Sequence, residues 1–79
     1  MRLIPGKLYQ LNAELWGASP DADRKGEVLR KYSLVLFFEY LPKIKIGRGN
    51  TLKRCLVLFE DRKLMLIGDV EDWLDQVSP

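Results

Sequence analysis

The densest group of chemically active side chains is a basic tract that contains no carboxylate. Its five cations lie between positions 43 and 54, and they are Lys43, Lys45, Arg48, Lys53 and Arg54. Such cations can contact phosphate oxygens along a nucleic acid, and the aromatic rings of Tyr40 and Trp16 could add stacking for bases. Alternatively, cations on a strand edge prevent pairing with other chains. The tract therefore predicts either a nucleic-acid-binding hairpin or a protected edge.

Residue types that carry catalysis are otherwise scarce. The chain has no histidine, which removes the commonest general base and metal ligand. Cys55 falls in the middle of a predicted strand, where a lone cysteine is typically a small buried hydrophobe. Gly47 and Gly49 precede a strand rather than a helix, unlike the glycines of a phosphate-binding loop. We therefore expect a protein that is not an enzyme and needs no cofactor.

A faint calcium-like spacing occurs in the polar segment 17–27, where Asp21 and Asp23 precede Gly26. A calcium loop also needs oxygen ligands at the positions that Lys25 and Tyr32 occupy here. A lysine in a ligand ring repels the ion. We expect a solvated loop and no metal.

Composition limits the class of protein. The 79 residues suit one domain over 1–79, and 47% of them are hydrophobic, as in globular proteins. One cysteine excludes an intrachain disulfide and fits a reducing, cytoplasmic setting. No apolar run approaches the ~20 residues that span a bilayer, so we expect no membrane association. Residues 1–54 carry a net charge of +6 and residues 55–79 a net charge of −4. This dipole either orients a partner or pairs strands within the fold.

The elements that must position these side chains are mostly strands. The apolar run Leu34–Leu41 predicts a central strand over 28–41, and its Leu-Val-Leu-Phe segment recurs at 56–59. Further strands are expected at 7–12, 43–46, 51–60 and 63–67, with turns at 47–50 and 61–62. Pro42 should mark an edge, a bulge or a bend. The register of the 47–50 hairpin stays open.

The chain end predicts a helical or 3₁₀ turn over 69–77, and the alternative for its last residues is a further short strand. Asp69 can cap a helix, and Val70, Trp73, Leu74 and Val77 share one helical face.

Both sides of the central strand are apolar, which predicts a surplus surface. We expect the even side, from Leu34 to Tyr40, to face the interior of a small barrel. The other side then needs cover from the Trp73 segment or from a second chain. Trp16 is expected to pack on the core at a barrel corner, whereas an exposed Trp16 would indicate a ligand contact. A protein-interaction surface, for self-association or another protein partner, is therefore predicted from Trp16, Val35, Phe37, Phe59 and Trp73.

The layout resembles an SH3-like barrel. The residues that carry the resemblance are the opening Leu3–Leu11, the loop 17–27, the two hairpin turns and the closing turn at Val70–Leu74. The run Pro-Gly-Lys-Leu-Tyr at 5–9, followed by Leu-Val-Leu-Phe and Val-Leu-Phe-Glu-Asp-Arg, is also similar to short uncharacterised proteins of tailed phages. The resemblance implies a mainly β fold, a small barrel of four or five antiparallel strands with a short C-terminal helical or 3₁₀ turn. The aromatic groove motif of peptide-binding SH3 domains is missing, so polyproline binding does not carry over.

Overall fold

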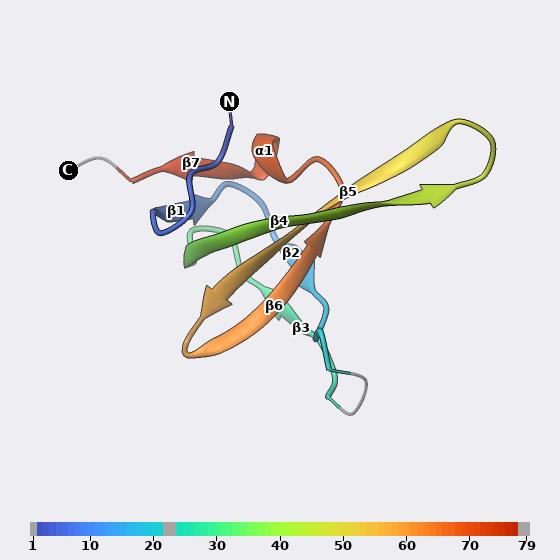
Figure 1. Ribbon diagram of the computed structural model, residues 1–79. Helices are drawn as coiled ribbons and strands as arrows, with labels where there is room; N and C mark the ends of the chain where they lie inside the picture. Colours follow the sequence, from blue (N-terminus) through green and yellow to red (C-terminus); the bar gives the residue numbers. More distant parts are fainter. Residues whose placement is uncertain (1, 22–23, 78–79) are drawn as a thin grey trace.

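The molecule consists of two antiparallel sheets (Figure 1), in a computed structural model that describes residues 2–21 and 24–77. The main sheet has the order β6-β5-β4-β1-β7, and its strands are β1 (Leu8–Leu11), β4 (Leu34–Ile46), β5 (Asn50–Phe59), β6 (Arg62–Ile67) and β7 (Leu74–Gln76). The second sheet pairs β2 (Leu15–Gly17) with β3 (Glu27–Leu29). A bridge between Ala18 and Met65 links β6 to the chain just after β2. The prediction of a mainly β, antiparallel fold is confirmed, but the described strands number seven and the sheets do not close.

The predicted central strand is in fact two strands in different sheets. Between β3 and β4 the chain turns, with Tyr32 at a φ of 75°. The Tyr32 N–H donates to the Leu11 carbonyl at 2.8 Å, and the Leu11 N–H donates to the Ser33 carbonyl at 2.9 Å. The prediction of one strand over 28–41 is therefore wrong, because Leu11 at the end of β1 forms hydrogen bonds with the backbone of Tyr32 and Ser33 and holds the chain in a turn there.

Two tight turns and two bulges shape the β4–β5–β6 meander. Ile46 pairs with Asn50, so a three-residue loop closes the first hairpin, and Gly47 and Gly49 have positive φ there. The register that the sequence left open is thereby determined. A register shift between Leu41 and Ile44 confirms a bulge at Pro42, and another lies between Phe37 and Glu39.

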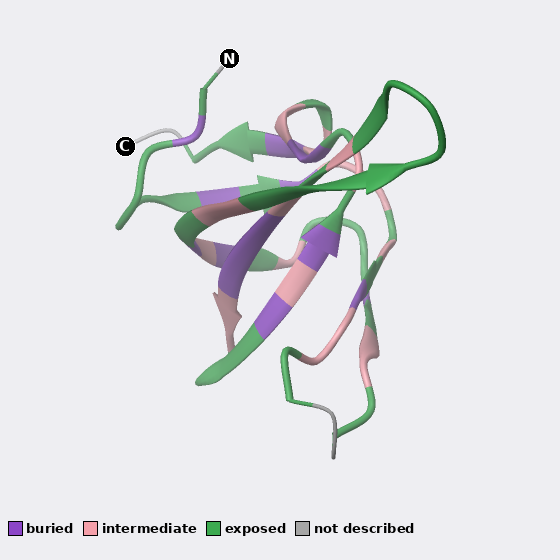
Figure 2. Ribbon diagram, turned by 45° about the vertical axis from the view of Figure 1, so that its right-hand side comes forward, coloured by how far each residue is buried: buried purple, intermediate pink, exposed green. Residues whose placement is uncertain are grey.

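The core lies on the odd-numbered side of β4. Val35 and Phe37 are 1% and 0% exposed, whereas Leu34 and Phe38 are exposed. Figure 2 shows buried segments in the strands of the body, while the projecting hairpin is almost entirely exposed. The prediction that the even side faces the interior is wrong from Leu34 to Phe38, because both sides are apolar and the covering elements decide between them. After the register shift between Phe37 and Glu39, even-numbered Tyr40 does pack against the core. The cover of the odd side comes from elements whose buried side chains join the same cluster, including Leu3, Leu29 of β3 and Val70. The full cluster is Leu3, Tyr9, Leu11, Leu29, Val35, Phe37, Cys55, Val57, Leu64, Leu66, Val70 and Leu74.

The C-terminal segment contains both of the elements that the sequence suggested. A single helical turn, α1 (Val70–Trp73), leads directly into β7, which pairs with β1. Gly68 has a φ of 121°, and a Cβ atom there would lie 2.6 Å from the Trp73 ring, so this glycine lets the ring approach the backbone. Trp73 is half-buried against the core. No helix in residues 2–21 and 24–77 is long and apolar enough to cross a membrane.

Candidate anion-binding site

Tyr40 is the centre of the candidate site and lies where β4 leaves the body of the molecule. It pairs with Cys55, which is buried, so the Tyr40 side chain lies on the core side of the sheet. Its ring packs edge-on against Phe37, with ring centroids 4.9 Å apart. Its hydroxyl accepts a hydrogen bond from the Leu3 N–H at 2.8 Å and donates one to Glu71 Oε1 at 3.0 Å. Phe37, the Leu3 backbone and Glu71 therefore fix the position of the Tyr40 side chain.

The N-terminal segment brings a cation to this ring. Buried Leu3 and the tyrosine hydroxyls fix the segment, because the Ile4 N–H also donates to Tyr9 Oη at 2.8 Å. Arg2 then places its guanidinium 4.6 Å from the centroid of the Tyr40 ring, a cation–π geometry. No sequence pattern linked Arg2 or Glu71 to the basic tract, because both are distant from it along the chain.

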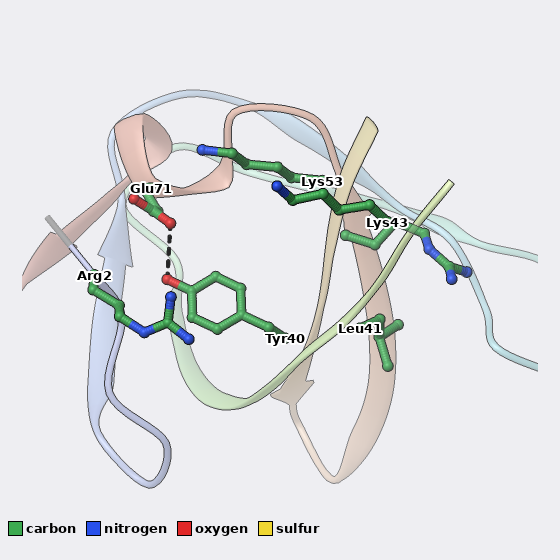
Figure 3. A pocket seen from close by; sticks show the side chains of 7 residues that line it. Arg2, Tyr40, Leu41, Lys43, Lys53 and Glu71 are labelled. Atoms are coloured by element: carbon green, nitrogen blue, oxygen red, sulfur yellow. Dashed lines mark hydrogen bonds between the residues drawn. The ribbon is translucent and has the colours of Figure 1, made fainter. Parts of the chain in front are cut away.

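Strand alternation places two lysines on the same side as Tyr40. From Arg54 to Phe59, β5 pairs with β6 without a register shift, and Cys55 and Val57 point into the core. The side chain of Lys53 consequently lies on the core side, beyond the end of the core itself. The Gly68 N–H donates to the Lys53 carbonyl at 2.9 Å and so fixes this backbone beside α1. Figure 3 shows Lys43 and Lys53 extending from the hairpin toward α1, with Arg2 approaching from another segment.

Arg54 has a structural contact that the basic tract did not reveal. Its Nε and Nη2 donate to the Pro42 carbonyl at 2.9 and 2.7 Å, and its Nη1 lies 3.8 Å from Met65 Sδ. The guanidinium thus binds the bulge of β4 while keeping its positive charge. Arg54 therefore stabilises the base of the hairpin through its hydrogen bonds to Pro42, and its guanidinium is less available for a ligand than the other cations of the tract.

The pocket that these residues line has a volume of about 300 Å³ and a strongly positive lining (Figure 3). Arg2, Lys43 and Lys53 against Glu71 give it a net charge of +2, since the Arg54 guanidinium is bonded to the Pro42 carbonyl on the other side of the hairpin. The lining residues are Arg2, Tyr40, Leu41, Lys43, Lys53, Arg54 and Glu71. In the described part of the chain both ion pairs involve Arg62, so no carboxylate neutralises Arg2, Lys43 or Lys53 at ion-pair distance. Burial raises the pKa of Tyr40 above 10.0; the hydrogen bond and charge of Glu71 also raise it, while the Leu3 N–H and Arg2 oppose the shift. The hydroxyl therefore stays protonated at neutral pH and acts as a donor to Glu71.

Beyond the pocket, the hairpin continues as a two-stranded arm that projects from the body (Figure 1). Lys45 pairs with Thr51, which follows the odd-numbered alternation of β5 and so shares a side with Lys53. The opposite side of the arm carries Ile44, Ile46 and Leu52. Arg48 occupies the tip between the two glycines. Of the predicted basic tract, three members line the pocket, Lys45 extends the same side, and Arg48 lies beyond both.

The residues predicted as an apolar interaction surface are dispersed. Val35 and Phe37 are core residues, so they form no surface, and Phe59 is half-buried. Trp16 is 60% exposed, so its prediction as a core residue is wrong; it pairs with Val28 at the edge of the small second sheet. Trp16 and Trp73 line a separate pocket of about 240 Å³, whose lining also includes Leu15, Met65 and Ile67. Trp16 therefore lies outside the cationic pocket and does not provide stacking there.

Reactive groups elsewhere in the described residues do not assemble. Cys55 is fully buried, and this desolvation raises the pKa of its thiol from 9.0 to about 12. The described residues contain no group of three or more His, Cys, Asp or Glu that could hold a metal ion, and Asp23 of the calcium-like spacing lies outside them.

Comparison with known proteins found no match, whether to family models, to curated proteins or to solved structures.

Proposed function

We propose that the protein is a small, non-catalytic binding module that binds the phosphate backbone of duplex nucleic acid through the pocket at Tyr40 and the cationic side of the arm. The observation that carries this proposal is the convergence of Arg2, Lys43 and Lys53 from two distant segments, with no carboxylate of residues 2–21 or 24–77 at ion-pair distance from them. Cations that are not paired within a protein gain most from an external anion.

The shape of the arm supports a duplex as the partner. A two-stranded β-ribbon fits the major groove of B-form DNA, which is about 12 Å wide. Among the described strands, none lies beside the arm beyond Arg54, so the arm can enter such a groove. The pocket at its foot would then hold phosphates at the groove edge.

Single-stranded binding is less well supported, because it uses exposed aromatic rings for stacking. The Tyr40 ring is packed by Phe37 on one side and covered by Arg2. On the cationic side, Lys43, Lys45 and Lys53 are accompanied only by Thr51 along the arm, a residue with limited capacity to read bases. We therefore expect affinity for duplexes with little sequence preference.

The test is fluorescence anisotropy with a labelled duplex of arbitrary sequence, titrated at several salt concentrations. If Arg2, Lys43, Lys45 and Lys53 each neutralise one phosphate, the slope of log K against log salt should be about −3.6. The combined variant Lys43→Glu, Lys45→Glu and Lys53→Glu should lose on the order of 100-fold in affinity at low salt. A matched control, Lys7→Glu, Lys25→Glu and Lys31→Glu, changes the net charge equally at other exposed sites and should lose far less.

Two results would contradict the proposal. One is the absence of any binding by the wild-type protein at low salt. The other is an equal loss of affinity in both triple variants, which would show that overall charge rather than this site attracts the duplex.

We also propose that the fold is an open form of the SH3-like barrel and that the chain is related to the tailed-phage proteins that its sequence resembles. What supports this is the meander β4–β5–β6 followed by one helical turn and a last strand beside β1. An experimental structure of a related phage protein with a different strand order would argue against it.

A further inference from the structure

The main sheet has an exposed apolar patch on the side opposite its core. Leu8 pairs with Leu36, which pairs with Leu58, so these three leucines form a row across β1, β4 and β5. Leu34 and Phe38 extend the row along β4, and Leu8, Leu34 and Phe38 are 52%, 50% and 42% exposed. We call these five residues the outer patch. A contiguous apolar surface of this kind marks an interaction site more often than single exposed leucines do.

The outer patch continues onto the arm. Residues 52, 54, 56 and 58 of β5 alternate with the core residues Cys55 and Val57, so Leu52 lies on the same side as Leu58. Ile44 pairs with Leu52, and Ile46 follows it two residues later. Both isoleucines are exposed. Apolar residues thus lie along this side from the body to the tip of the arm, opposite the lysines of the cationic site, with Glu39 and Arg54 between the outer patch and the arm. We call these apolar residues together the strip.

We propose that this strip is the interface of a homodimer, in which the outer patches of two copies face each other across a two-fold axis. At ~3.3 Å per residue and ~4.8 Å per strand, the strip covers roughly 500 Å² on each copy. The total, on the order of 1,000 Å², lies at the low end of specific interfaces and predicts a weak, concentration-dependent dimer.

The charges beside the strip favour a second copy over a partner of one charge sign. Glu39 pairs with Leu56 and Lys63 pairs with Leu58, so both side chains lie on the outer side. Neither forms an ion pair within the described residues, and Lys63 Nζ instead lies 4.6 Å from the centroid of the Phe38 ring. A two-fold axis between them would bring Glu39 of each copy to Lys63 of the other, which satisfies both charges twice. Arg54, the other cation on this side, is already bonded to Pro42.

This interface uses the side of the hairpin opposite the lysines of the proposed nucleic-acid site. Because a dimer would bring two arms together, self-association is measured without nucleic acid, and duplex binding is measured at protein concentrations at which the monomer predominates. The homodimer can therefore fail while duplex binding holds, and the reverse.

The test is sedimentation velocity of the full chain from about 1 to about 300 µM, the range in which weak dimers dissociate. The wild-type protein should shift from monomer to dimer across this range. Leu34→Lys should raise the dissociation constant of the dimer at least ~10-fold. Val77→Lys also introduces a lysine at an exposed apolar residue, but outside the strip, and should leave the dissociation constant unchanged. Circular dichroism verifies that each variant is folded.

A charge exchange tests the two-fold arrangement itself. Glu39→Lys and Lys63→Glu should each weaken the dimer, because each places like charges together across the interface. The double variant should restore wild-type association. A wild-type protein that stays monomeric at every concentration, a dimer that survives Leu34→Lys, or a double variant no better than the single ones would each overturn the proposal.

Discussion

The same two strands behave differently in the body and in the arm. Around Phe37 and Val57, β4 and β5 are flanked by β1 and β6, and one side of the sheet is fully buried. Beyond Leu41 and Arg54 the strands pair only with each other, and nearly all their side chains are exposed. Side chains alternate between the two sides of the sheet in both regions, but only the arm alternates lysines with isoleucines, whereas both sides are apolar in the body. The comparison shows that alternation assigns a side to each residue, while neighbouring elements decide whether that side becomes core or binding surface.

The largest difference between the two regions should appear in stability. Phe37→Ala removes a fully buried ring that packs against Tyr9 and Tyr40, and should cost about 3–5 kcal/mol. Ile46→Ala removes an exposed side chain of the arm and should cost less than about 0.5 kcal/mol. Urea unfolding followed by tryptophan fluorescence measures both.

Phe37→Ala is also expected to leave much of this small domain unfolded. Phe37→Leu should retain a folded population and lose about 1–2 kcal/mol, so it provides a measurable intermediate. Similar losses at positions 37 and 46 would show that the arm packs against something in the isolated chain, and the contrast between the regions would be lost.

Alkaline pH should destabilise the body through Cys55. The folded-state pKa of this thiol is raised from 9.0 to about 12, so between these values the unfolded chain releases a proton that the folded chain keeps. Stability is therefore fully present below pH 9 and falls as the pH rises, by about 2 kcal/mol at pH 10.5. Cys55→Ala lacks this titration, so urea unfolding of both proteins from pH 7 to 10.5 isolates it from tyrosine ionisation. Parallel pH profiles for the two proteins would mean that the thiol is not protected by burial.

The smallest effect concerns the junction between arm and body. Arg54→Lys keeps the charge but cannot donate two hydrogen bonds to the Pro42 carbonyl in the same geometry. We expect a loss of about 1 kcal/mol or less in global stability, and faster amide hydrogen exchange confined to the arm. Exchange that is unchanged in residues 43–53, or that rises equally throughout the molecule, would show that Arg54 does not hold the arm separately.

Much of the local structure could be predicted because it depends on short-range patterns. The strands at β1, β5 and β6 and the glycine turn at 47–49 lie close to their predicted positions, since apolar alternation and positive-φ residues act over a few positions. Proline in a strand predicted an edge, a bulge or a bend at Pro42 for the same reason, and the register shift between Leu41 and Ile44 is the bulge among these. The basic tract was equally visible, and its lysines do share one side of the hairpin.

Contacts between residues that are distant along the chain could not be predicted from short-range patterns. Arg2 and Glu71 join the site only because the Tyr40 hydroxyl connects the N-terminal segment to α1. The break at Tyr32 and the exposure of Trp16 likewise depend on which strands become neighbours.

The amino-acid sequence by itself determined that this chain is mainly β, that five of its 13 lysines and arginines lie within one hairpin, and that it contains no histidine. These properties follow from residue types and their spacing along the chain. Only the tertiary structure decided which side of β4 is buried. Both sides are apolar, but other segments, including Leu3, Leu29 and Val70, pack against the side that carries Val35 and Phe37. That choice made Val35 and Phe37 core, left Leu34 and Phe38 exposed, and placed the lysines beside Tyr40.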